Sequence, residues 1–563
     1  MAREKKRLGD MLIAEHIINQ EQLSAALKAA AEEHKRIGEI LVEFGYATEE
    51  AIAQAISRQQ GFEIVSLNGM QIDQKVLDLV DGEVLRKHVM IPFAYDDQNM
   101  NLIKVAMADP MDIMAMDDFS IITNLQVEPV IATPHEIMLA LDKYYGNREA
   151  LKAAQQYAKE RESVQAAQNQ EEDDMDVNSS PIVKLVNSMI EQAARQRASD
   201  IHIEAMEHTV RVRYRIDGAL YEKTAYDIHL LSAIIARLKI MAGMDISEKR
   251  KPQDGRITMM IDRKEYDIRA SILPTVYGEK CVMRLAQKRV FTRDKKDLGF
   301  SEREMELFEN ILKNPNGILL VTGPTGSGKS TTLYTALSEL NTEEVNIITV
   351  EDPVEANIDG VNQVQVNTKA DLTFASALRS ILRQDPDIIM IGEIRDTETA
   401  QIAVQASITG HLVVSTLHTN SAASTLTRLM DMGIESYLLA DSMVGVIAQR
   451  LVRCLCPHCK KERNATEEEK EVLDIAEEAP LKVFDAIGCE HCGGTGYYGR
   501  TGVYEIMKIT PAVREVISRR GTAEEIKQVA MRGGMSTLRM SSRKYVLNGT
   551  TTVSEMLRVA FEN

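Results

Sequence analysis

The chain has 563 residues, of which 44% are hydrophobic, and this length and composition predict several domains with ordinary packed cores. Its 66 lysines and arginines against 84 aspartates and glutamates give a formal net charge of −18, which disfavours the nonspecific electrostatic binding used by nucleic-acid-binding proteins. The basic start is not followed by an apolar core, and no run of about 18 apolar residues occurs. We therefore expect a chain that is neither secreted nor membrane-spanning by its own signals.

The chain opens on a duplicated segment. "RLGDMLIAEHIINQEQLSAALKAA", which begins at Arg7, aligns with "RIGEILVEFGYATEEAIAQAISRQ", which begins at Arg36, and the alignment pairs Leu23 with Ile52. Two copies are fewer than the three or more that a solenoid needs, so the duplication predicts a pseudo-symmetric pair that suits a pseudo-symmetric ligand. The alternative is that both copies are helical hairpins whose aliphatic residues only form a core.

Changes in composition divide the rest of the chain. The mixed segment after the duplication completes an N-terminal domain over residues 1–145, and the polar, acidic stretch over residues 146–179 predicts a flexible linker. An amphipathic helix followed by alternating strands predicts a small α+β domain over residues 180–288. Over residues 289–563, the apolar runs "GILLVTG", "NIITVED", "DIIMIGE" and "HLVVSTLH" alternate with helical stretches, which predicts a mostly parallel sheet covered by helices.

The first of these strands is followed by the glycine-rich stretch "GPTGSGKST". Its form G-x-x-x-x-G-K-S wraps backbone N–H groups around nucleotide phosphates at a helix N-terminus, while the lysine reaches the β and γ phosphates and the serine binds Mg²⁺. A glycine-rich turn that only joins a strand to a helix would leave the lysine unexplained. The predicted ATP- and Mg²⁺-binding residues are Gly323, Pro324, Thr325, Gly326, Ser327, Gly328, Lys329, Ser330 and Thr331, with Ser330 as the Mg²⁺ ligand.

Acidic residues and histidines follow the next strands. "TVEDPVE" places Glu351 and Glu355 at or just past one strand end, and "DPDIIMIGEIRD" places Glu393 just past another. Carboxylates there can hold the water shell of the metal and orient or deprotonate the attacking water. Single acids at loop ends are usually only solvated, but their joint occurrence after the phosphate loop favours catalysis. "GHLVVSTLHTN" adds His411 and His418 at the two ends of a strand, where each is either catalytic or structural.

These four motifs, in this order, resemble the Walker A, Asp box, atypical Walker B and His box of the secretion ATPase superfamily (GspE/PulE type), which powers type II secretion and type IV pili. The similarity continues through "ASDIHIE", "RVRYRIDG", "KPQDGRI" and "PTVYGEKCVMRL" upstream, and to the C-terminus downstream. The resemblance implies a RecA-like α/β P-loop ATPase domain preceded by an α+β (PAS-like) domain. It also implies a homohexamer in which the α+β domain of a neighbour closes over the ATP site.

The resemblance assigns further catalytic residues beside Lys329. Arg269 in "YDIRAS" and Arg284 in "VMRL" are similar to the family's arginines that reach the phosphates, where arginine stabilises charge on the transferring phosphoryl group. The alternative for either arginine is an ordinary charge on a strand surface. Glu355 is the expected water-activating residue. Glu393 and His418 complete the catalytic set through the Walker B motif and the His box.

Two C-x-x-C knuckles, "CPHC" and "CEHC", have the spacing of a tetrahedral structural zinc site. The long gap between the knuckles predicts helical structure of its own, and disulfides are the weaker alternative because a cytosolic compartment keeps thiols reduced. Cys454 lies close enough to complicate the ligand assignment, and Cys281 is expected to be a buried hydrophobic residue. This insertion resembles that of the extension and secretion ATPases, whereas the retraction ATPases lack it. The predicted zinc ligands are Cys456, Cys459, Cys489 and Cys492.

The duplicated segment resembles the N-terminal domain of the MshE-type pilus ATPases, in which two such copies, five residues apart, bind cyclic di-GMP. Arginine suits guanine because it can stack on the ring and bond O6 and N7. The second copy fits the pattern well. The first copy departs from it with His16 in place of glycine and Ala30 in place of glutamine. The residues expected to bind cyclic di-GMP include Arg7, Gly9, Arg36, Gly38 and Gln59.

The resemblance therefore implies a hexameric motor ATPase that drives type IV pilus assembly through an inner-membrane platform protein (PilC/GspF-like), with ATP, Mg²⁺ and Zn²⁺ as cofactors and regulation by cyclic di-GMP. We expect a cytoplasmic protein that is recruited to the inner face of the inner membrane by membrane-associated assembly proteins. Type II protein secretion is the close alternative. A DNA-translocating RecA-like motor is disfavoured, because the acidic net charge makes a nucleic-acid partner unexpected. A non-enzymatic nucleotide receptor would bind without turnover.

Overall fold

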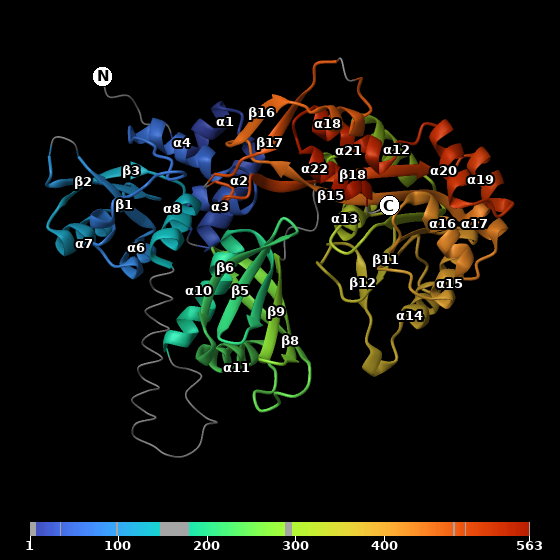
Figure 1. The fold of residues 1–563 in the computed structure, drawn as a ribbon, viewed down its shortest axis with the longest axis horizontal. Helices are drawn as coiled ribbons and strands as arrows, with labels where there is room; N and C mark the ends of the chain where they lie inside the picture. The colour runs from blue at the N-terminus through green and yellow to red at the C-terminus, as the bar shows by residue number, and fades with distance from the viewer. Residues whose placement is uncertain are drawn as a thin grey trace. The chain divides into compact units, whose positions relative to one another are not determined.

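The protein is described here from a computed structural model (Figure 1). The described residues are 7–33, 35–96, 99–146, 180–287, 295–476, 479–489 and 491–561. They fall into two compact units, of which the first is Met1–Ile261 with Ile268–Leu285 and the second is Asp262–Asp267 with Ala286–Asn563. Apart from Gly146, the predicted linker over residues 146–179 lies outside the described residues. None of the described helices is long and apolar enough to cross a membrane.

Each copy of the duplicated segment forms a helical hairpin. The four helices are α1 (Leu8–Ala14), α2 (Gln20–Glu33), α3 (Ile37–Glu43) and α4 (Glu49–Gln60). α1 packs against α4 and α2 packs against α3, around one shared apolar core. A Cβ added to Gly9 would lie 2.5 Å from Leu23 Cδ1, and one added to Gly38 would lie 3.1 Å from Ile52 Cγ2. Aligned glycines thus face aligned aliphatic residues, which confirms the predicted pseudo-symmetry.

The first copy keeps the backbone path of the second despite its departure from the motif. Gly45 ends the first helix of the second copy with φ +70°, and His16 occupies the equivalent position with φ +58°. A side chain in this left-handed region costs about 1–2 kcal/mol, which glycine avoids. The loss of glycine in the first copy is therefore an energetic cost, with no change in the course of the chain.

The next part of the first unit, to residue 146, is a small mixed domain. Its three-stranded sheet has the order β1-β2-β3, with β1 antiparallel and β3 parallel to β2. The elements are α5 (Gln74–Leu77), α6 (Gly82–His88), β1 (Met90–Tyr95), β2 (Leu102–Met107), α7 (Ile113–Thr123), β3 (Gln126–Ile131), α8 (Pro134–Leu141) and a π-helical turn (Asp142–Gly146). A separate apolar core joins the helices to the sheet. The predicted helical and mixed character of this region is confirmed.

The remainder of the first unit contains the predicted α+β domain. Its six-stranded sheet has the order β6-β5-β4-β9-β8-β7. The elements are α10 (Ser180–Arg195), β4 (Ala198–Ala205), β5 (Thr209–Ile216), β6 (Ala219–Asp227), α11 (Leu231–Ala242), β7 (Gln253–Ile261), β8 (Lys264–Thr275) and β9 (Gly278–Gln287). Alternate residues of β5 are buried, and the Tyr214 hydroxyl donates a hydrogen bond to Met189 O in α10 at 2.8 Å. One face of the sheet is thus fixed against the helices.

The second unit is built on a seven-stranded sheet with the order β12-β11-β13-β14-β10-β15-β18. All neighbouring pairs are parallel except β15 and β18, which are antiparallel. The strands are β10 (Gly317–Thr322), β11 (Ile347–Glu351), β12 (Asn362–Gln365), β13 (Ile388–Ile391), β14 (Leu412–Leu417), β15 (Met443–Leu455) and β18 (Tyr497–Lys508). The four predicted apolar runs correspond to β10, β11, β13 and β14, as expected.

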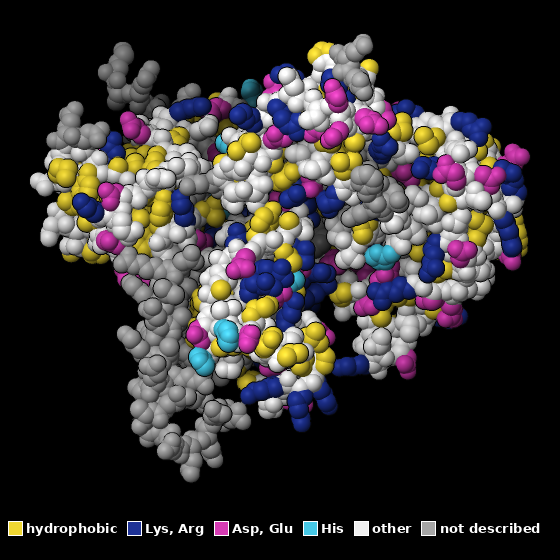
Figure 2. Space-filling model, in the orientation of Figure 1, with side chains coloured by type: hydrophobic (Ala, Val, Ile, Leu, Met, Phe, Trp, Pro, Cys, Tyr) yellow, Lys and Arg dark blue, Asp and Glu magenta, His cyan; other side chains and the backbone are white. Residues whose placement is uncertain are grey.

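Helices cover both faces of this sheet. Leu320 of β10 belongs to one apolar core and its neighbour Leu319 belongs to the other, because successive side chains point to opposite faces of a strand. The helices are α12 (Glu302–Leu312), α13 (Lys329–Leu340), α14 (Phe374–Ile381), α15 (Thr397–Ile408), α16 (Ala422–Asp431), α17 (Ser436–Ser442), α19 (Pro511–Ser518), α20 (Ala523–Arg532), α21 (Leu538–Leu547) and α22 (Val553–Phe561). Figure 2 shows positive and negative side chains interspersed on the visible face of this unit.

The segment between the two cysteine knuckles contains α18 (Glu467–Val472), as the predicted helical content required. It also contains an antiparallel pair of strands, β16 (Lys460–Asn464) and β17 (Lys482–Ala486), which we did not predict. Both strands have only five residues, and β16 is polar throughout, so the apolar alternation that reveals a strand is weak there.

Candidate active site

The phosphate-binding loop lies between β10 and α13. Its lysine, Lys329, is the first residue of α13 and is buried, with Nζ donating hydrogen bonds to Gly323 O at 2.8 Å and Pro324 O at 3.1 Å. Gly323 has φ +152°, and a Cβ there would lie only 2.4 Å from Gln449 O, so no other residue fits this position without movement. The loop is therefore closed tightly around its own lysine.

The charge state of this lysine reflects its surroundings. Burial lowers the pKa of Lys329 to about 8, the Glu393 carboxylate opposes this change, and the Arg450 guanidinium adds to it. A phosphate group placed beside the ammonium would favour its charged form. The loop thus holds a poorly solvated cation that an anionic ligand can stabilise.

The carboxyl ends of four parallel strands meet at this edge of the sheet. Val350 of β11 pairs with Ile391 of β13, and Ile391 pairs with Ser415 of β14, so the residues that follow these strands are neighbours. Glu393 Oε2 lies 3.5 Å from His418 Nε2. This arrangement brings together the predicted Walker B glutamate and the predicted His-box histidine.

The carboxyl group of Glu393 is held in its charged form. Burial alone would raise the pKa of Glu393, but the hydrogen-bonded ion pair with Arg395 and the nearby His418 and Lys329 outweigh burial and lower it. A charged carboxylate next to a lysine-lined phosphate loop can hold a metal-bound water.

The two glutamates of the Asp box have different surroundings. Glu351 is 3% exposed, and its carboxylate accepts hydrogen bonds from the side chains of Tyr334, Thr349 and Gln363. With three donors and almost no exposed surface, Glu351 is a structural residue and does not face the phosphate loop as a free acid. Glu355 is only half-buried and lies in the loop beyond it, so the structure separates the two acids that the sequence placed together.

The two histidines at the ends of β14 also separate. His411 precedes the strand, and its Nδ1 lies 2.8 Å from Ala406 O, so it belongs to the opposite edge of the sheet and is structural. His418 follows the strand and its side chain is half exposed, beside Glu393. Of the two alternatives left open by the sequence, only His418 lies at the site.

Arg269 and Arg284 belong to strands β8 and β9 of the six-stranded sheet in the first unit. Their strand neighbours Ile268 and Met283 are buried, so both arginines point to the opposite face of that sheet. Arg284 Nε donates a hydrogen bond to Asp200 Oδ1 at 3.2 Å. The structure thus places the two arginines on one sheet face, and their contact with a neighbour's phosphates stays a prediction.

Two residues that contact the phosphate loop in the second unit were not predicted. Gln449 and Arg450 lie in β15, are each 2% exposed, and pass directly beneath the phosphate loop. Gln449 Oε1 accepts a hydrogen bond from Thr332 of α13 at 2.8 Å, and Arg450 Nη2 donates to Asn420 O at 3.1 Å. A polar pair inside the apolar run "VGVIAQRLV" was the sequence signal that could have revealed them.

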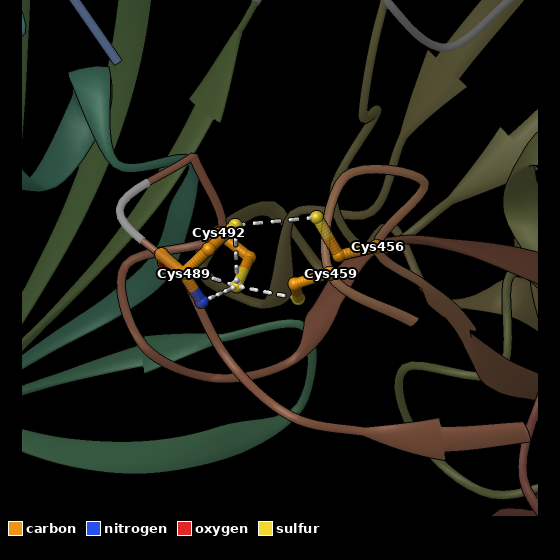
Figure 3. A group of neighbouring side chains, drawn as sticks. All are labelled: Cys456, Cys459, Cys489 and Cys492. Atoms are coloured by element: carbon orange, nitrogen blue, oxygen red, sulfur yellow. Dashed lines mark hydrogen bonds between the residues drawn. The ribbon is translucent and has the colours of Figure 1, made fainter. Parts of the chain in front are cut away.

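The four predicted zinc ligands form a cluster in the second unit (Figure 3). Their sulfurs lie within 4.8 Å of one another, and the hydrogen-bonded Sγ pairs are 3.8 to 3.9 Å apart. Four sulfurs bound to zinc at about 2.3 Å in a tetrahedron are about 3.8 Å apart, so the cluster fits zinc. Cys454 is not part of the cluster, and Cys281 is fully buried in β9, where burial raises its pKa to about 12.

The thiols of this cluster have different acidities. Burial raises the pKa of Cys459 to about 12. For Cys492, burial is outweighed by hydrogen bonds from the backbone N–H groups of Cys489 and Gly496, which lower its pKa to about 7. Backbone donors to a sulfur stabilise a thiolate, which is the form that binds metal.

The arginines of the duplicated segment occupy equivalent positions. Arg7 precedes α1 and Arg36 precedes α3, both with extended backbone and both exposed. Arg36 also forms an ion pair with Asp109. Gly9 and Gly38 serve the close packing of the helices described above, so their part in the motif is explained without a ligand.

The strand order of the second unit, the loop between β10 and α13, and the carboxylates at neighbouring strand ends define a P-loop nucleoside triphosphatase with a RecA-like fold. The sequence matches the type II/IV secretion system protein family over residues 175–558 and the MshEN domain over residues 60–151. The chain therefore belongs to the type II/IV secretion system protein family. The MshEN match begins after the duplicated motif.

Individual relatives agree with this assignment. The type IV pilus assembly ATPase PilB of Myxococcus xanthus is 43% identical over 562 residues, which cover 98% of each chain. The type II secretion system protein E of Pseudomonas aeruginosa is 50% identical over 393 residues, which cover 70% of this chain and 77% of the relative. The solved structure of the ATPase DotB from Yersinia pseudotuberculosis is 20% identical, covers 70% of this chain and 98% of that one, and shares the fold with a TM-score of 0.51.

Proposed function

We propose that the chain hydrolyses ATP and uses the energy to assemble type IV pili. The observation that carries this proposal is the buried Lys329 inside its glycine-rich loop, at the sheet edge where Glu393 and His418 meet. This arrangement suits the phosphates of ATP on the loop and a metal-bound water beside them. Ser330 would hold Mg²⁺ together with the phosphates, and the ion would supply positive charge against the charge that develops on them.

Each acidic residue has a separate role in this reaction. Glu355 activates the attacking water, because it is the less buried of the two Asp-box glutamates, whereas the carboxylate of Glu351 is held inside the core by three side-chain donors. Glu393 orients the metal's water shell, and its lowered pKa keeps it charged at neutral pH. His418 contacts the transferring phosphate from the end of β14. A Glu355→Gln protein should bind ATP with unchanged affinity but release phosphate far more slowly, and wild-type turnover would remove Glu355 from this role.

Pilus assembly is favoured over type II secretion by the extent of the similarity. The pilus assembly relative aligns with 98% of this chain, including the N-terminal region, whereas the secretion relative aligns with 70%. Type II secretion remains the second candidate because identity over that shared part is 50%. Deleting the gene in its own bacterium should abolish surface pili and leave export of folded proteins intact. Loss of export with normal pili would select the alternative.

The motor works as a homohexamer that acts on an inner-membrane platform protein. Arg269 and Arg284 of one subunit reach the phosphates bound by its neighbour, which couples hydrolysis to movement of the α+β domain. Zinc bound by the four clustered cysteines is structural, since all four positions of a tetrahedral site are occupied by protein ligands. DNA-stimulated hydrolysis that is sensitive to salt would instead support a DNA-translocating motor.

The duplicated segment is proposed to bind cyclic di-GMP and to regulate the motor. Two exposed arginines at equivalent helix starts, related by the internal pseudo-symmetry, suit a ligand with two identical guanines. The match to the MshEN domain in the adjoining residues supports this proposal. Because the first copy has lost its glutamine at position 30, binding depends more on Arg36 and Gln59 of the second copy than on Arg7.

Calorimetry with the full chain tests the regulatory proposal. Arg36→Ala should weaken cyclic di-GMP binding about tenfold or more, through the lost stacking and hydrogen bonds, and Arg7→Ala should weaken it less. Arg519→Ala is a matched control, because Arg519 is an exposed, ion-paired arginine at the end of α19, outside the duplicated segment. Absence of binding by the wild-type chain at millimolar cyclic di-GMP would indicate that the two copies only form a helical core.

A further inference from the structure

The buried carboxylate of Glu351 is the centre of a hydrogen-bond network behind the phosphate loop. Thr349 Oγ1 donates to it at 2.7 Å and Gln363 Nε2 donates to it at 3.0 Å, while Tyr334 supplies its phenolic hydroxyl. Thr349 and Tyr334 are fully buried. Such a saturated network inside a core is rigid, because every alternative arrangement would leave a buried polar group without a partner.

The same network holds the loop that carries Glu355, both at Glu355 itself and at the residues that follow it. The backbone N–H of Glu355 donates to the Tyr334 hydroxyl at 3.1 Å. Just after Glu355, Gln363 Nε2 donates to Ala356 O at 3.0 Å, and Gln363 Oε1 accepts the N–H of Ile358 at 2.8 Å. Tyr334 and Gln363 both converge on Glu351, so the position of Glu355 is tied to one buried acid.

Tyr334 connects the loop that carries Glu355 to the phosphate-binding loop. It lies in α13, the helix whose first residue is Lys329. Its hydroxyl donates to Glu351 and accepts from Glu355, which a phenol can do and phenylalanine cannot. Burial and the adjacent Glu351 raise the pKa of Tyr334, so the phenol keeps its proton and remains a donor.

We propose that Tyr334 is a positioning residue for ATP hydrolysis, which fixes Glu355 relative to the phosphate loop through its hydrogen bonds to the Glu355 backbone and to Glu351. The inference rests on the proposed role of Glu355 in activating water. Tyr334 is fully buried, and it acts through these hydrogen bonds. Its hydroxyl sets the distance between the attacking water and the phosphate bound near Lys329.

The test is Tyr334→Phe in the full chain, which keeps the ring and removes only the hydroxyl. Since a misplacement of about 1 Å can cost roughly 100-fold in rate, we expect kcat to fall about tenfold to 100-fold with ATP affinity unchanged. Tyr504→Phe is the matched control, because Tyr504 is 1% exposed in the same unit and its hydroxyl donates to Leu298 O at 2.7 Å, away from this network. The control should lose similar thermal stability but keep its kcat. A wild-type kcat in Tyr334→Phe would overturn the inference.

A second comparison separates this inference from the role of Glu355. In a Glu355→Gln background, Tyr334→Phe should cause little further loss, because the group that it positions is already gone. An equal loss in both backgrounds would overturn positioning through Glu355. A reduced kcat in Glu355→Gln with a normal kcat in Tyr334→Phe would contradict only the positioning role of Tyr334. A normal kcat in Glu355→Gln would contradict the catalytic role of Glu355 itself. If Tyr334→Phe does not fold, Gln363→Met releases the residues that directly follow Glu355 and should reproduce the fall in kcat. An unchanged kcat there would overturn the proposal.

Discussion

Replacing Thr322 by valine should loosen the connection between the phosphate-loop strand and the segment that carries His418. Thr322 is fully buried at the end of β10, and its hydroxyl accepts the backbone N–H of Thr419 at 2.9 Å and lies 2.6 Å from Thr419 Oγ1. Valine has the same shape but cannot accept a hydrogen bond. The Thr419 N–H would lose its partner, which costs about 1–3 kcal/mol of the free energy of unfolding.

This loss should lower the Tm of the ATPase unit by roughly 2–12 °C, at about 2–4 °C per kcal/mol for a domain of this size. Differential scanning calorimetry measures the change, and phosphate release should slow because His418 is less well held. Thr551→Val is the matched control: Thr551 is equally buried, but its hydroxyl donates to Arg453 O at 2.7 Å, so the change leaves a carbonyl rather than an N–H without that partner. Equal Tm values for the two variants, with normal hydrolysis, would refute the reasoning.

Three further predictions concern charge, metal and subunits. ATP binding should be accompanied by proton uptake above about pH 8, because burial lowers the pKa of Lys329 to about 8 and the bound phosphate restores its charged form. Calorimetry in buffers of different ionisation enthalpy should detect this uptake. Absence of proton uptake would contradict phosphate binding at Lys329. Cys489→Ser should reduce zinc content from near one per chain and lower the Tm without changing ATP affinity, whereas a stable, metal-free wild type would exclude the site. Mixing Arg284→Ala with Lys329→Ala proteins should restore some hydrolysis in verified mixed hexamers, and no restoration would argue against a shared site.

The parts of the fold that the sequence predicted are those with a strong periodic signal. The strands β10, β11, β13 and β14 are buried on both faces, so they are continuous apolar runs between helical segments. Some of the strands that were missed lack that signal. β12 has four partly exposed residues, and β16 is almost entirely polar, so their pairing is set by tertiary context alone.

The candidate site was predictable where chemistry and spacing coincide, as in the phosphate loop and the cysteine knuckles. Sequence spacing could not distinguish Glu351 from Glu355, because only the fold shows that Tyr334 and Gln363 converge on Glu351. The polar pair inside an apolar run marks Arg450 as unusual, but the sequence could not show that a strand far along the chain brings it beneath the phosphate loop. The surroundings of these residues are set by long-range packing, which spacing along the chain does not reveal.

The central claim is that the chain is an ATPase whose turnover depends on the buried lysine of the phosphate loop. Steady-state phosphate release by the purified full chain with Mg²⁺ and ATP, compared with Lys329→Ala, tests it most directly. We predict release by the wild type and loss of both ATP binding and release in Lys329→Ala, because the variant lacks the cation enclosed by Gly323 and Pro324. Equal release by the two proteins, or no release by a wild type that binds ATP, would contradict the account.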